Sequence, residues 1–208
     1  IRPTPGIDRV FLREAWQFSA GAYIAGMLIS APNMIIPIMV LHVLGAESTA
    51  SYYITYAIVS ILFMIPYAFT TSLFVEGSHG GEMKRSVFRT LASMFALLIP
   101  AIIGLSLFGE QILNLIGKDY VEGVALLQVL ALSALFVSVC QTFISIAKVR
   151  SDIKNLILLS GFVSVALLGL GYTLMQRFGL IGMGYAWLGT YAAGTLLVGL
   201  ILKRKGWM

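Results

Sequence analysis

Long stretches without charged residues alternate with short charged segments along the whole chain. Each stretch holds 20 residues or more, and about 20 apolar residues are needed for a helix to cross the hydrocarbon core of a bilayer. This pattern predicts an all-α, polytopic integral membrane protein. The six expected transmembrane helices cover residues 16–42, 48–75, 90–109, 123–147, 155–176 and 178–202, the last two joined by a very tight turn around Arg177 and Gly179.

The connecting segments differ in charge. If the six stretches cross a membrane, twelve of the 14 basic residues fall on one side: Arg2, Arg9, Arg13, Lys84, Arg85, Arg89, Lys148, Arg150, Lys154, Lys203, Arg204 and Lys205. Only Lys118 and Arg177 fall on the other side. Cytoplasmic loops of membrane proteins carry the excess of lysine and arginine. We therefore expect both termini in the cytoplasm, with residues 1–15 as a cytoplasmic segment, 16–202 as a six-helix transmembrane lobe and 203–208 as a basic cytoplasmic tail.

Composition agrees with a membrane protein and narrows its chemistry. The chain is 59% hydrophobic and 11% charged, with a mean hydropathy of +0.92, whereas soluble domains are about 25% charged. Membrane topology explains the net charge of +5, so no nucleic-acid partner is expected. The single cysteine, Cys140, excludes an internal disulfide and a cysteine-built metal site. No cofactor or metal is expected, and because the chain begins at Ile1 without a signal-like segment, we expect a piece of a longer protein.

The first expected span has polar and helix-breaking residues inside it. Pro32 and Pro37 each remove a backbone donor, and Asn33 lies between them. Small and polar residues follow at steps of three or four, which places them on one helix face: Ser19, Tyr23, Gly26, Ser30, Asn33 and Pro37. A bent span with such a stripe either lines a transporter cavity near the membrane midplane or packs against a neighbouring helix.

The second and fourth spans carry further candidate residues. Tyr56 and Tyr67 lie deep in the second span, and their hydroxyls need a partner across a helix interface or in a wet cavity, whereas Tyr52 and Tyr53 are expected to anchor its outer end. In the fourth span a polar stripe at helical spacing continues to the cationic inner mouth: Ser138, Gln141, Thr142, Ser145, Lys148 and Arg150. This stripe is either hydrogen-bonding glue between helices or the wall of a hydrophilic pathway.

The third and sixth spans show packing patterns instead of candidate chemistry. The third contains Pro100 and few polar groups, which favours a kinked, lipid-facing helix. In the sixth, small residues recur every fourth position, at Gly182, Ala186, Thr190 and Gly194. Such a seam permits close contact between helices.

Four runs together resemble a known family: LGAESTASYYITYAI, ILFMIPYAFTTSLFVEGS, LFGEQILNLIGKDYVEGVALLQVLAL and MQRFGLIGMGYAWLGTYAAG. In order and spacing they resemble the C-terminal half of polysaccharide and O-antigen flippases, whose superfamily also contains multidrug antiporters. The resemblance implies one six-helix lobe of a transporter of about twelve to fourteen helices in the cytoplasmic (inner) membrane, which moves lipid-linked oligosaccharide by alternating access. The N-terminal lobe would then be missing from these 208 residues.

The resemblance, joined to the residue patterns, gives a set of expected substrate contacts. Asn33, Tyr56, Gln141, Thr142 and Ser145 would line the pathway, and Lys148 and Arg150 would attract the pyrophosphate of a polyprenyl-linked substrate. No catalytic residue is expected. Two other functions remain open: a cation-coupled multidrug antiporter, although none of the six spans contains the usual carboxylate, and a non-transporting membrane scaffold. An acyl- or glycosyltransferase would need acidic or histidine groups that converge near the membrane interface, and no motif joins Glu47, Glu110, Asp119 and Glu122.

Overall fold

The computed structural model describes residues 9–78 and 83–205, and every element in these ranges is helical. The elements are α1 (Arg9–Ser78), α2 (Met83–Ile116), the short 3₁₀ helix η1 (Lys118–Gly123), α3 (Val124–Val149), α4 (Ile153–Phe178) and α5 (Leu180–Lys205). The predicted all-α class is confirmed. Within the described ranges, five helices are long and apolar enough to cross a membrane.

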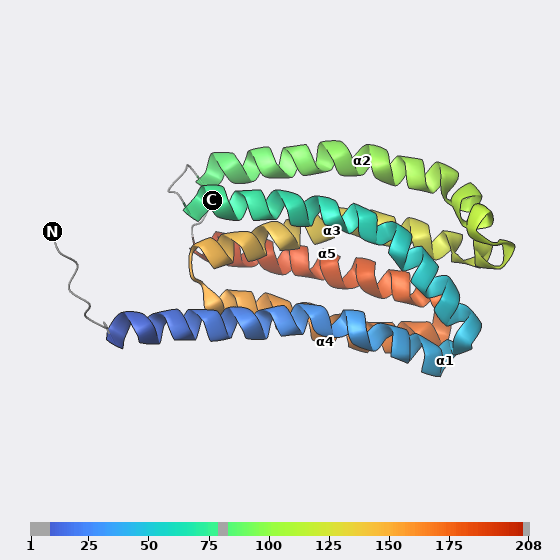
Figure 1. Ribbon diagram of the computed structural model, residues 1–208, viewed down its shortest axis with the longest axis horizontal. Helices are drawn as coiled ribbons and strands as arrows, with labels where there is room; N and C mark the ends of the chain where they lie inside the picture. The colour runs from blue at the N-terminus through green and yellow to red at the C-terminus, as the bar shows by residue number, and fades with distance from the viewer. Residues whose placement is uncertain (1–8, 79–82, 206–208) are drawn as a thin grey trace.

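The first of these helices consists of two helical segments joined at Gly45. Gly45 has φ +87° and ψ −179°, a conformation that side-chain-bearing residues rarely adopt. The hydroxyl of Thr49 donates to the Gly45 carbonyl over 2.7 Å, at the start of the second segment. Figure 1 shows the result: α1 runs along the molecule, turns, and returns towards the end where it began, with the second arm diverging from the first. The first two expected spans are therefore the two arms of this hairpin.

Prolines do not interrupt these arms. Backbone dihedrals stay helical through Pro32, Pro37 and Pro66, and only Gly45 departs from them inside α1. The expected break at the first two prolines is thus displaced to the glycine. Pro32 is buried and Pro37 half-buried, and each removes a single backbone hydrogen bond without ending the helix.

All long segments run roughly along one axis, so their ends collect at two ends of the molecule (Figure 1). One end, which we call the basic end, holds the start of α1, the α1–α2 and α3–α4 connections and the end of α5. It carries Arg13, Lys84, Arg85, Arg89, Lys148, Arg150, Lys154, Lys203, Arg204 and Lys205. Gly45, Lys118 and Arg177 lie at the opposite end, whereas Arg2 lies outside the described residues.

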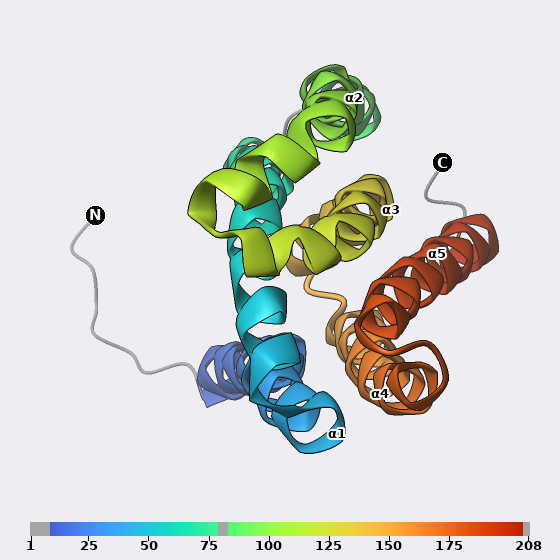
Figure 2. The same ribbon diagram turned by 90° about the vertical axis from the view of Figure 1, so that its right-hand side faces the viewer.

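Helix α3 lies at the centre of the packing, between the second arm of α1, α2 and α5 (Figure 2). Leu127, Leu130 and Phe143 of α3 are at most 1% exposed. The first arm of α1 packs on α4, where the position of a Cβ on Gly161 would lie 3.8 Å from Leu28. The two arms of the hairpin therefore pack on different helices.

Small residues let α5 approach its neighbours. Gly182, Ala186, Thr190 and Gly194 are all buried, and a Cβ on Gly194 would lie 3.1 Å from the sulfur of Cys140 on α3. The predicted packing seam is therefore confirmed. The turn before it is as tight as expected, since Gly179 alone, with φ +65°, separates α4 from α5.

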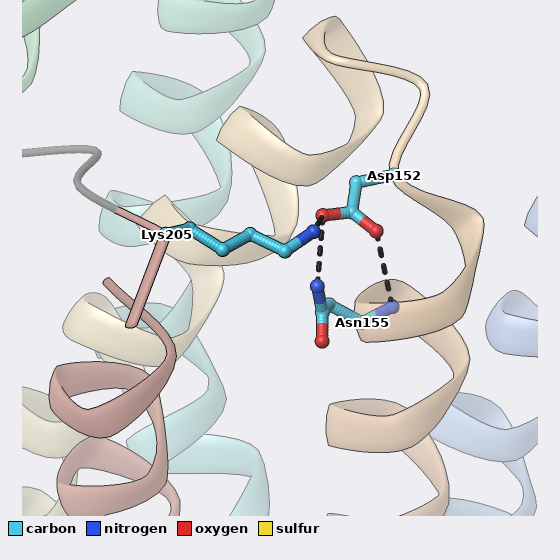
Figure 3. A network of polar contacts seen from close by, with 3 residues as sticks. All are labelled: Asp152, Asn155 and Lys205. Atoms are coloured by element: carbon cyan, nitrogen blue, oxygen red, sulfur yellow. Dashed lines mark hydrogen bonds and ion pairs between the residues drawn. The ribbon is translucent and has the colours of Figure 1, made fainter. Parts of the chain in front are cut away.

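A polar cluster ties the α3–α4 connection to the end of α5 (Figure 3). The Asp152 carboxylate caps α4 by accepting from the Asn155 backbone N–H at 3.4 Å and from its side-chain amide at 2.8 Å. The Lys205 ammonium also donates to this carboxylate in an ion pair. Burial opposes the charged form, but the hydrogen bonds from Lys205 and Asn155 outweigh burial and lower the pKa of Asp152.

Replacing Asp152 with alanine is expected to destabilise the fold by about 1 kcal/mol, the usual effect of removing a helix N-cap. Thermal unfolding in detergent at neutral pH measures this loss. Because the folded pKa lies below the unfolded value near 4, the contribution is complete above that value and is lost as the pH falls through the folded pKa. Lys205→Gln, which keeps the cap, should unfold closer to the parent; equal midpoints for Asp152→Ala and the parent would contradict the capping role.

Candidate functional site

The polar stripe predicted on the first span lies on the surface of the first arm of α1. Its members Ser19, Tyr23, Gly26, Ser30 and Asn33 are all exposed. Tyr23 is 71% exposed, and a Cβ added to Gly26 would have nothing within 4 Å. Pro37, the last member of the stripe, is half-buried. Because the rest of the stripe is exposed, it is not a closely packed seam between the described helices of this chain.

Two of the candidate residues, Asn33 and Tyr56, form a hydrogen bond at this stripe. The Tyr56 hydroxyl donates to the Asn33 side-chain oxygen over 2.8 Å, which joins the two arms of α1. Asn33 lies twelve residues before Gly45 and Tyr56 eleven residues after it. At about 1.5 Å per residue, both lie about 17 Å from the turn of the hairpin. Asn33 is exposed and Tyr56 half-buried, so the pair presents polar atoms at the surface.

An aromatic cluster fixes the position of Tyr56. Its ring stacks on Tyr52 with centroids 5.7 Å apart and lies 5.7 Å from the ring of Trp187 on α5. Trp187 in turn stacks on Phe63 at 5.2 Å and on Tyr191 at 5.4 Å. The expected anchoring role of Tyr52 is wrong, because this ring is only 2% exposed and packs inside the cluster. Tyr53 beside it is 54% exposed.

The second arm of α1 continues the polar surface towards the basic end. Tyr67 is 70% exposed, and the hydroxyl of the exposed Thr71 donates to its carbonyl over 2.8 Å. Residues 56, 60, 67 and 71 recur at helical spacing, so they share one side of this arm.

The α3 candidates lie elsewhere. The Ser145 hydroxyl donates to the Thr70 carbonyl of α1 over 2.9 Å, and the Thr142 hydroxyl donates to the Ser138 carbonyl over 2.8 Å. Thr142 and Ser145 are buried, and Gln141 is half-buried. Ser145 therefore acts as an interhelical hydrogen-bond donor, as the glue interpretation of this stripe expects. These side chains do not share the exposed face that carries Asn33.

The two candidate cations lie at the basic end. Lys148, in the last turn of α3, and Arg150, the residue that ends α3, are both exposed. Arg150 lines a cavity of about 330 Å³ together with Lys84, Thr142 and apolar residues of α2, α3 and α5. Lys148 does not line it. Lys148 and Arg150, which are predicted to share one role, therefore lie in different surroundings.

The side chains of the described chain form no group of three or more His, Cys, Asp or Glu suited to hold a metal ion. Comparison of the chain with protein-family models, curated proteins and solved structures gives no match. The functional argument therefore depends on the fold and on the chemistry of its surface.

Proposed function

We propose that this chain is one lobe of a membrane transporter that flips lipid-linked oligosaccharide across the cytoplasmic membrane by alternating access. The observation that carries the proposal is the exposed polar stripe of α1 with the hydrogen-bonded Asn33–Tyr56 pair. It lies in a helix that has no charged residue between Ala15 and Ala46. The family resemblance of the sequence supports the choice of substrate.

The exposed surface of α2 is more apolar than the exposed stripe of α1, which indicates that the stripe does not face lipid tails. The exposed side chains of α2 between Phe88 and Phe108 include Leu97, Ile103 and Leu107, and such a surface suits lipid tails. Exposing an amide to hydrocarbon, by contrast, costs about 1–3 kcal/mol by protein mutational data. A partner lobe and the water-filled cavity between the lobes would remove that cost. The stripe is therefore the surface on which we expect the missing lobe to close.

The depth of the Asn33–Tyr56 pair fits a central binding site. If the Gly45 turn lies at the membrane surface, the pair lies about 17 Å inside, close to the middle of a hydrocarbon core of about 30 Å. Transporters hold their substrates near the midplane, between lobes that rock against each other. Asn33 and Tyr56 would contribute amide and hydroxyl groups to hydrogen bonds with sugar hydroxyls.

If each arm of α1 crosses the membrane by itself, the chain would cross six times, and the start of α1 and the end of α5 would share the side of the basic end. The positive-inside rule then puts the basic end in the cytoplasm, where polyprenyl-pyrophosphate substrates would load. The exposed Lys148 is suited to attract the pyrophosphate, while the polyprenyl tail stays in the bilayer. Gln141, Thr142 and Ser145 would support α3 as it moves with its lobe.

Flipping of a labelled polyprenyl-pyrophosphate oligosaccharide in proteoliposomes tests the proposal. The labelled substrate is loaded into one leaflet, and a membrane-impermeant reagent is added on the other side. In vesicles with the longer protein that joins this lobe to its partner, the label should become accessible to the reagent. In vesicles with this chain alone it should not, because one lobe cannot enclose the stripe. No flipping by a folded two-lobe protein would refute the proposed substrate, and a drug gradient driven by cations in the same vesicles would favour the antiporter.

A further inference from the structure

A cavity of about 330 Å³ opens between α2, α3 and α5 at the basic end, away from the α1 stripe. Both α2 and α5 pack on α3, and Figure 2 shows them on different sides of it. Lys84 and Arg150 line the cavity together with apolar side chains that include Phe88, Leu91, Val139 and Val198. This size is at the lower end of small-ligand pockets, which span about 300–1,000 Å³.

The charged and apolar walls are separated along the helix axes. Lys84 is in the first turn of α2 and Arg150 ends α3, so both lie at the mouth of the basic end. Leu91 lies seven residues after Lys84 and Val139 eleven residues before Arg150, which corresponds to about 10 and 16 Å of helix. The cavity therefore runs from the level of lipid head groups into the level of acyl chains.

We propose that this cavity binds one anionic phospholipid, with the phosphate at Lys84 and Arg150 and an acyl chain along Leu91, Val139 and Val198. Two cations and no acidic side chain line it within the described chain, and charge-assisted hydrogen bonds to phosphate are the strong kind. A soluble phosphate compound fits the cavity less well than a phospholipid, because it would leave the apolar walls in contact with water. Arg150 then serves the phospholipid, which leaves Lys148 for the transported substrate.

Two neighbouring hollows at the same end fit a phospholipid less well. The one beside Glu76 is polar and contains that carboxylate with Arg85 and Arg89. The larger one between α4 and α5, about 690 Å³, also combines cations with apolar side chains, but its deepest lining residue on α5, Leu197, is only seven residues from Arg204. That is about 10 Å of helix, against about 16 Å between Arg150 and Val139. The cavity with Lys84 and Arg150 is thus the best match to a lipid with one phosphate and a long tail.

Retention of phospholipid by the purified protein tests the proposal without any transport assay. The result therefore does not depend on the proposed function. The complete chain is reconstituted with equal amounts of phosphatidylglycerol and phosphatidylcholine and extracted in mild detergent. Phospholipid bound per chain is then counted by mass spectrometry. We expect one retained phosphatidylglycerol and little phosphatidylcholine. Lys84→Gln/Arg150→Gln should weaken retention about 30-fold, since each basic residue near an anionic surface contributes about 1 kcal/mol and about 1.4 kcal/mol is tenfold.

The control Arg13→Gln/Lys203→Gln removes the same charge from the basic end but lines neither this cavity nor its neighbours. It should retain phosphatidylglycerol as the parent does. Val139→Phe keeps both cations and fills the acyl site, so it should also lose the lipid while helical content and elution volume stay unchanged. Equal loss in the control, retention by Val139→Phe, or displacement of the lipid by inorganic phosphate would overturn the proposal.

Discussion

Gly182→Ala is expected to destabilise the fold by about 3 kcal/mol, the upper part of the range for overpacked cores. A Cβ at this position would lie 2.5 Å from the carbonyl carbon of Leu174 and 2.8 Å from the backbone nitrogen of Met175. Real Cβ atoms essentially never come so close to their neighbours. Backbone atoms cannot rotate away as a flexible side chain can, so the α4–α5 hairpin would have to open.

The same helix offers a matched control for this substitution. Gly189 is exposed, and a Cβ there would meet nothing within 4 Å. Because alanine is favoured over glycine inside a helix by about 0.5–1 kcal/mol, Gly189→Ala should leave stability unchanged or raise it slightly. Thermal unfolding of both variants in one detergent separates the two predictions. If Gly182→Ala and Gly189→Ala shifted the unfolding temperature in the same direction and by the same amount, close packing at Gly182 would not limit stability.

Asn33→Leu is expected to lower oligosaccharide flipping by the two-lobe protein about tenfold, if the polar stripe lines the pathway. A lost hydrogen bond that leaves its partner unsatisfied costs about 1–3 kcal/mol, and about 1.4 kcal/mol corresponds to a factor of ten. Asn33→Leu also removes the acceptor of the Tyr56 hydroxyl, so it should lower the free energy of unfolding by about 0.5–1.5 kcal/mol, which leaves the protein folded. Initial flipping rates at matched protein insertion measure the effect.

Its neighbour supplies the control. Met34 is 75% exposed, and Met34→Leu changes the same helix surface without removing a polar group, so its flipping rate should equal that of the parent. Tyr56→Phe removes the hydroxyl that bonds Asn33. If the pair acts as one unit, the double variant should be no slower than Asn33→Leu alone. Unchanged flipping in a folded Asn33→Leu protein would place the pathway elsewhere.

Much of the fold follows from two regular patterns in the sequence. Charge-free stretches predict the helices because each must satisfy its own backbone in an apolar environment. The basic connections predict which ends lie together, as the start of α1, the α1–α2 and α3–α4 connections and the end of α5 show (Figure 1). The seam from Gly182 to Gly194 is equally predictable, because spacing of four places small residues on one face.

The candidate site is less predictable, for identifiable reasons. The Asn33–Tyr56 hydrogen bond joins residues 23 positions apart, so it depends on the turn at Gly45 and not on spacing along one helix. Periodicity also cannot show which side of a helix is covered, and here the stripe on α1 is exposed whereas Ser145 on α3 is buried. The prediction of Tyr52 as an interface anchor is wrong for a similar reason. Tyr52 stacks on Tyr56, and the ring of Tyr56 contacts Trp187 of α5, far along the chain.

The packing of Cys140 makes this chain well suited to site-directed labelling. Its sulfur is buried beside Gly194 and lies 3.8 Å from the Tyr191 carbonyl oxygen, and the residue is 1% exposed. Thiol reagents in water or in the bilayer cannot reach it while the bundle is folded. Because it is also the chain's single cysteine, a cysteine introduced at Ser30 or Gly26 would carry a fluorophore or spin label alone, and would report directly on whether the α1 stripe is wet.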